Sequence, residues 1–90
     1  MATKLYTLAA VERFADKNPN SLVATIPGTL LDSYIYAIGK RFLLIKAVFL
    51  NEYESAYSIH NFEDLEKCYR KLGFESESDY RETGEREGWL

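Results

Sequence analysis

The sequence has too few histidines and cysteines to build most metal and redox sites. Its 90 residues contain one His and one Cys, whereas a structural zinc site needs a tetrahedral set of nitrogen or sulfur ligands. A single Cys also excludes a disulfide within the chain, so the Cys content does not indicate an oxidising compartment. We therefore expect no metal ligands and no cofactor.

Long apolar runs are also missing. The apolar stretches fall short of the roughly 20 residues that a membrane-spanning helix needs. The first residues lack the charged, apolar and small-residue layout of a secretory signal. From these two absences we expect a soluble, cytoplasmic protein with no membrane partner.

Motifs that carry chemistry are not found either. Gly39-Lys40 lacks the earlier glycine and the following helix of a phosphate-binding loop, so it indicates a hairpin turn. Cys68 falls on the apolar stripe of a predicted helix, which favours a buried structural thiol over a nucleophile paired with His60. The clustered carboxylates stand in polar stretches, where they are usually solvated. We therefore expect no catalytic residue and no enzyme activity.

The sequence is rich in apolar residues and has an excess of acidic residues. Hydrophobic residues make up 47% and aromatic residues 14%, which is ample for the core of one domain. The net charge is −3, and the excess is uneven: residues 61–90 hold nine Asp/Glu against five Lys/Arg. The acidic balance disfavours nonspecific binding to nucleic acid.

Residues 33–60 predict three consecutive antiparallel strands. Glycine at the first loop position of Gly39-Lys40 suits a type II′ turn, which fixes the register of the hairpin. The predicted pairs are Ile38 with Arg41, Tyr36 with Leu43, and Tyr34 with Ile45. Both faces of residues 41–50 are apolar, so this strand is predicted to be central. It would be covered on both sides, or by helices on one side and a partner on the other.

The flanking segments complete an α+β pattern. A helix capped by Thr7 precedes a strand at 21–26, and a second helix capped by Asn61 ends at Gly73. We predict a four-stranded, mainly antiparallel meander in the order α-β-β-β-β-α, with a short helical tail. The domain spans residues 1–74, and residues 75–90 form an acidic short helix or tail packed on it or extending from it. The expected arrangement places both helices on one sheet face.

The tail and one loop are predicted to carry the binding site. Tyr53 lies in an acidic loop between Glu52 and Glu54, and Tyr80 and Trp89 lie in the acidic tail, with no obvious core to enter. Aromatic residues on an acidic surface are typical of a binder of basic proteins. The second apolar sheet face would then be hidden by a homodimer or by that partner.

The function that best fits these features is a small non-catalytic protein-binding module. Its concrete form is an accessory protein of a phage or mobile element that inhibits a host or defence protein, in the manner of anti-CRISPR inhibitors. One alternative is a nucleic-acid-binding regulator that uses Lys40, Arg41 and Lys46 together with the tyrosines. A second alternative is a small enzyme or toxin.

Overall fold

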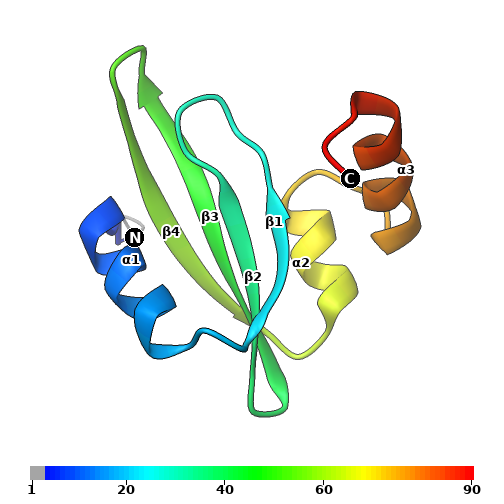
Figure 1. Ribbon diagram of the computed structural model, residues 1–90, viewed down its shortest axis with the longest axis horizontal. Helices are drawn as coiled ribbons and strands as arrows, with labels where there is room; N and C mark the ends of the chain where they lie inside the picture. The colour runs from blue at the N-terminus through cyan, green and yellow to red at the C-terminus, as the bar shows by residue number, and fades with distance from the viewer. Residues whose placement is uncertain (1–3) are drawn as a thin grey trace.

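The chain forms one four-stranded antiparallel sheet with helices on both sides (Figure 1). The computed structural model describes residues 4–90. Its elements are α1 (Leu8–Lys17), β1 (Leu22–Ile26), β2 (Ser33–Ile38), β3 (Arg41–Asn51), β4 (Glu54–Phe62), α2 (Leu65–Lys71) and α3 (Glu77–Glu87). The predicted α+β meander is therefore confirmed, and the predicted short helical tail is the helix α3.

The central hairpin has the predicted register. Gly39 has a φ of 63°, and Lys40 has no positive φ, as a type II′ turn requires. Ile38 pairs with Arg41, and the ladder continues to Tyr34 and Ile45. Strand order along the sheet follows the chain, so β2 and β3 are central and β1 and β4 lie at the edges.

The two faces of the sheet are covered by different helices, so the prediction that both helices share one face is wrong. On one face α1 supplies Val11 to a core that includes Tyr36 and Ile45. On the other face α2 supplies Cys68 to a core that includes Leu44. The sheet lies between α1 and α2 in Figure 1. A homodimer was expected because one apolar sheet face would otherwise be uncovered. That expectation loses its basis, because α1 and α2 each cover one face.

The α1 face is dominated by aromatic contacts. Thr7 caps α1 as predicted, because its Oγ1 accepts a hydrogen bond from the Ala10 N–H at 3.2 Å. Phe14 meets Tyr36 edge to face, with 4.9 Å between ring centroids. The Tyr57 hydroxyl is buried and makes no hydrogen bond within residues 4–90.

The segment before α1 lies along the free edge of β4. Tyr6 and Tyr57 exchange two backbone hydrogen bonds, of 2.8 and 3.0 Å, in a single antiparallel bridge. Tyr6 is therefore paired with the sheet, while Met1–Thr3 lie outside the described part of the chain.

The second helix begins later than predicted. Asn61 and Phe62 belong to β4, where they pair with β3, and Asp64 caps α2 by accepting from the Glu66 N–H at 2.8 Å. The C-terminal end is as predicted: Gly73 has a φ of 100°. The next amide, of Phe74, donates to the carbonyl of Tyr69 at 3.0 Å. This is the Schellman arrangement.

The acidic tail is a helix that packs on α2. Ser76 caps α3 by accepting from the Asp79 N–H at 3.1 Å. Gly84 lies inside this helix, and Trp89 and Leu90 fold back over it. A Cβ at Gly84 would lie 2.8 Å from the Trp89 ring and 2.5 Å from Leu90, so the glycine makes this close approach possible.

Candidate partner-binding surface

The candidate partner-binding surface begins where β3 continues past the end of β2. The last β2–β3 pair is Tyr34 with Ile45, and the Ala47 N–H then donates to the Ser33 Oγ at 2.8 Å. Beyond this point β3 pairs only with β4, so residues 48–51 and 54–56 form a two-stranded projection at one end of the molecule (Figure 1).

The tip of this projection is held by local hydrogen bonds. The Asn51 Oδ1 accepts from the Tyr53 N–H at 2.8 Å, and the Ser55 Oγ donates to the Val48 carbonyl at 2.7 Å. The Tyr53 side chain is 89% exposed, and Glu52 and Glu54 beside it are exposed. The three site residues predicted in this loop are therefore together and accessible.

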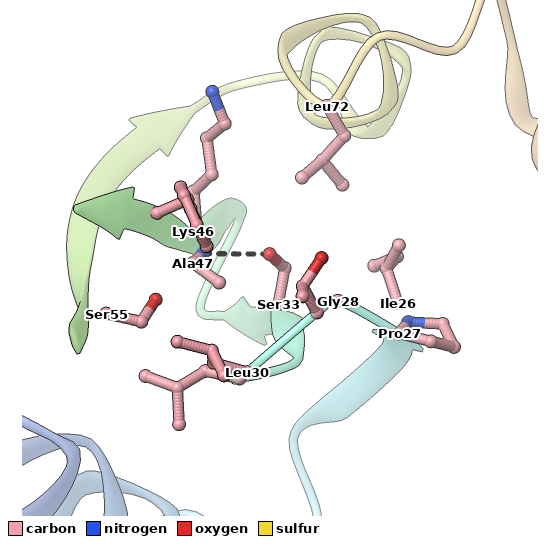
Figure 2. Close-up of a pocket in the computed structure, with 12 residues that line it drawn as sticks. Ile26, Pro27, Gly28, Leu30, Ser33, Lys46, Ala47, Ser55 and Leu72 are labelled. Carbon is pink, nitrogen blue, oxygen red and sulfur yellow. Dashed lines mark hydrogen bonds between the residues drawn. The ribbon is translucent and has the colours of Figure 1, made fainter. Parts of the chain in front are cut away.

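A groove separates the projection from the loop that joins β1 to β2. Its volume is about 250 Å³, and Figure 2 shows the loop residues facing Ala47 and Ser55 across it. A second hollow of about 420 Å³ continues toward α1 and the tip. Both cavities are lined by Leu30, Leu31 and Ser55, so they adjoin.

The β1–β2 loop turns sharply to present its leucines to this groove. The Gly28 N–H donates to the Asp32 Oδ1 at 3.2 Å, which closes residues 28–32 into a turn. A Cβ on Gly28 would overlap the Leu31 carbonyl oxygen, so the turn requires glycine there. The loop thereby holds Leu30 beside the projection with its side chain half exposed.

Large apolar side chains gather at this end of the molecule. Phe49 is 60% exposed on β3, and Leu8 on α1 and Leu30 in the loop are also exposed. We name this region the hairpin-tip surface, and its members are Leu8, Leu30, Leu31, Phe49, Glu52, Tyr53 and Glu54. An apolar centre with a charged rim is the usual anatomy of a protein interface.

Negative charge extends beneath this surface. Burial first, and then the carboxylates of Asp32 and Glu12, raise the pKa of Tyr34. Burial also raises the pKa of Tyr57 to about 12, with a further contribution from Tyr34 and the same two carboxylates. Asp32 and Glu12 therefore place negative charge near these two tyrosines, while Lys46 also lines the 250 Å³ groove.

The two site residues predicted in the tail lie elsewhere. Tyr80 is 5% exposed and stacks on Tyr69, with ring centroids 4.7 Å apart. Trp89 is partly buried, with its centroid 5.4 Å from that of Tyr80. The premise that these aromatics have no core to enter is wrong, because α3 folds back and carries both into the α2 core.

The basic residues of the nucleic-acid alternative do not converge. Arg41 and Lys46 differ by an odd number of positions along β3, so their side chains leave opposite faces of the sheet. Arg41 also forms an ion pair with Glu63, with 3.2 Å between Nη1 and Oε1. Lys40 lies in the β2–β3 turn, at the opposite end of β3 from the hairpin-tip surface.

The thiol of Cys68 is buried in the α2 core. Its side chain is fully buried, and burial, followed by the nearby Asp64 charge, raises its pKa to about 11. The thiol therefore stays protonated near neutral pH, which is unfavourable for a nucleophile. Within residues 4–90 no three His, Cys, Asp or Glu side chains are arranged to hold a metal ion.

Sequence reasoning missed the apolar half of the hairpin-tip surface. Leu30 and Leu31 stand in a turn between Pro27 and Asp32, where two adjacent leucines are unusual for a solvated loop. These two leucines are the feature of the sequence from which an exposed apolar patch in this loop could have been predicted. Leu8 opens α1 on its apolar stripe, so its exposure could be seen only once the helix was placed on the sheet.

Comparisons give no assignment of function. None of the helices in residues 4–90 has the length and apolar character needed to cross a membrane. No protein-family model, no curated protein and no solved structure matches the chain.

Proposed function

We propose that the protein is a small non-catalytic protein-binding module that docks through the hairpin-tip surface. The observation that carries this proposal is the exposure of Phe49 and Tyr53 on a projection that β2 does not support. Large exposed aromatics are costly to leave in water and are common contact residues in interfaces. The expected partner is a protein with a basic surface around an apolar centre.

Charge complementarity supports this choice of partner. Glu52 and Glu54 flank the exposed Tyr53, and the chain carries a net charge of −3. Acidic rim residues speed association with a basic protein and repel acidic competitors. The hairpin-tip surface therefore combines apolar contact residues with an acidic rim, and the rim favours a positively charged partner.

The finer form of the proposal is that binding inhibits the partner. A chain of this size that belongs to a phage or mobile element would block a host or defence protein, in the manner of anti-CRISPR inhibitors. Small size, acidity and the lack of a recognised catalytic motif support this form. Basic nucleic-acid-binding proteins are its natural targets, because their surfaces attract acidic proteins.

Site-specific photo-crosslinking tests where the partner docks. A photoreactive phenylalanine analogue is placed at Tyr53, and a matched control carries it at Ile38, an exposed strand residue beside the β2–β3 turn. In lysate of the native host, Tyr53 is expected to capture a basic protein that Ile38 does not. Equal capture at both positions, or capture at Ile38 alone, refutes this docking surface.

Titration with the captured protein then tests the two parts of the surface. Phe49→Ala and Tyr53→Ala are expected to weaken binding without changing the melting temperature. The double variant Glu52→Lys/Glu54→Lys is expected to slow association. Its matched control is Glu82→Lys/Glu85→Lys on α3, which changes the net charge equally on exposed positions elsewhere. If the α3 control slows association as much, the rim makes no specific contribution.

A further inference from the structure

A third hollow, with the opposite charge, lies on the α2 face of the sheet. Its volume is about 210 Å³, and it is lined by Leu5, Lys46, Val48, Ser58, His60 and Lys71. Lys46 pairs with Ser58 across β3 and β4, so their side chains lie on the same face. His60 follows two positions along β4 on that face. We name this hollow the lysine pocket.

The lysine pocket is positively charged in a chain that is acidic overall. Its lining contains no Asp or Glu. Within residues 4–90, neither Lys46 nor Lys71 takes part in a salt bridge. Burial first, and then the charges of Lys71 and Lys46, lower the pKa of His60, so both ammonium groups lie close enough to act on the imidazole.

A serine and a histidine form the inner wall. The Ser58 Oγ lies 2.9 Å from the His60 Nε2, and Ser58 is almost fully buried. When the imidazole is neutral at Nε2, the hydroxyl donates to it. When the imidazole is protonated, Nε2–H donates to the Ser58 Oγ, and the hydroxyl proton is free to point at a bound anion. Protonation of His60 therefore adds both a positive charge and a hydrogen-bond donor.

We propose that the lysine pocket binds the phosphate monoester of a small organic molecule. A phosphate monoester carries a charge of about −1.5 to −2 near neutral pH, which two ammonium groups can balance. The Ser58 hydroxyl provides a further donor to its oxygens. Leu5 and Val48 form an apolar wall that would contact the organic part of the ligand.

Binding of a phosphate should raise the pKa of His60. The groups that face the imidazole are Lys46 from β3 and Lys71 from α2, together with Ser58 and the stacked Phe62 ring from β4. A bound dianion would offset both lysine charges and favour the protonated imidazole. Because the chain has one His, its ring signals identify this site without ambiguity.

The test is an NMR titration with inorganic phosphate and with phenyl phosphate as separate probes. Both are expected to shift the ring signals of His60 and to raise its pKa, with phenyl phosphate binding more tightly through the apolar wall. The variant Lys46→Gln/Lys71→Gln is expected to bind about tenfold or more weakly. Its control is Lys40→Gln/Lys67→Gln, which removes the same charge from exposed positions outside the pocket.

Three results overturn the proposal. The first is an unchanged His60 signal with both probes. The second is equal weakening in the control variant, which would show nonspecific attraction to positive charge. The third is binding of a single-stranded oligonucleotide without binding of inorganic phosphate or phenyl phosphate, which would assign the pocket to nucleic acid. Circular dichroism of each variant establishes that it is folded.

Discussion

Leu44 is the position at which a single charge should unfold this domain. The side chain is 0% exposed, in the middle of β3 and in the core under α2. Truncation of a buried leucine to alanine costs about 2–5 kcal/mol. An aspartate adds the penalty for burying an unpaired carboxyl group, which is on the order of several kcal/mol. A chain of 90 residues is stable by only about 5–13 kcal/mol in total. Leu44→Asp should therefore remove most or all of the stability.

The same strand provides the control. Leu50 lies at the irregularity of the β3–β4 ladder near the tip of the projection, and it is 47% exposed. Leu50→Asp should change stability by only about 0.5 kcal/mol, as surface substitutions do. Circular dichroism and urea unfolding distinguish the two outcomes, and Leu44→Ala should give a folded protein with a lower urea midpoint. If Leu44→Asp melts cooperatively at the temperature of Leu50→Asp, the α2 core is not what stabilises the fold.

Three further substitutions test individual side chains. Tyr57→Phe should stabilise the domain by about 0.5–1 kcal/mol in urea unfolding, because it removes a buried hydroxyl that has no hydrogen-bond partner among residues 4–90; a loss of stability would show that the hydroxyl is satisfied. Cys68→Ala should cost about 1–2 kcal/mol and leave partner binding unchanged, and the native thiol should react with thiol reagents only when the chain unfolds. The lowered pKa of His60 means that the unfolded chain, with a His pKa near 6.5, binds a proton more tightly than the folded chain. Stability is therefore greatest above about pH 6.5 and decreases as the pH falls toward the folded pKa, and His60→Gln should remove that part of the pH dependence.

Alternation and turn chemistry were sufficient to predict the sheet. The glycine at Gly39 specified the turn and the β2–β3 register, and the two apolar faces of residues 41–50 identified β3 as central and covered. These features depend on local sequence, because the sheet face on which a side chain lies follows from the number of residues between it and the turn. The same rule does not specify which helix covers which face. That depends on how the short connections at 18–21 and 63–64 leave the sheet.

The errors at the C-terminal end share a physical cause, which is that contacts between residues distant in sequence decide the structure there. Phe62 fits both the apolar stripe of a helix and the inward face of a strand, and pairing with Phe42 at the end of β3 decides in favour of the strand. Gly84 is unfavourable in a helix, but Trp89 and Leu90 pack against the space that a larger side chain would fill. The exposure of Tyr53 could be predicted because it stands in a polar turn. The burial of Tyr80 could not, because it depends on contacts with residues distant in sequence.

Covering the sheet with separate helices also divides the molecule into layers of unequal strength. The layer formed by α1 contributes one buried side chain, Val11, whereas α2 and α3 together contribute Cys68, Tyr69 and Tyr80. A layer opens at a free-energy cost set by the contacts that it loses. Amides of residues 8–17 should therefore exchange with solvent through a partial opening, well before those of residues 65–71. In that transient state the sheet and its C-terminal helices stay intact while the aromatic face around Tyr36 meets water.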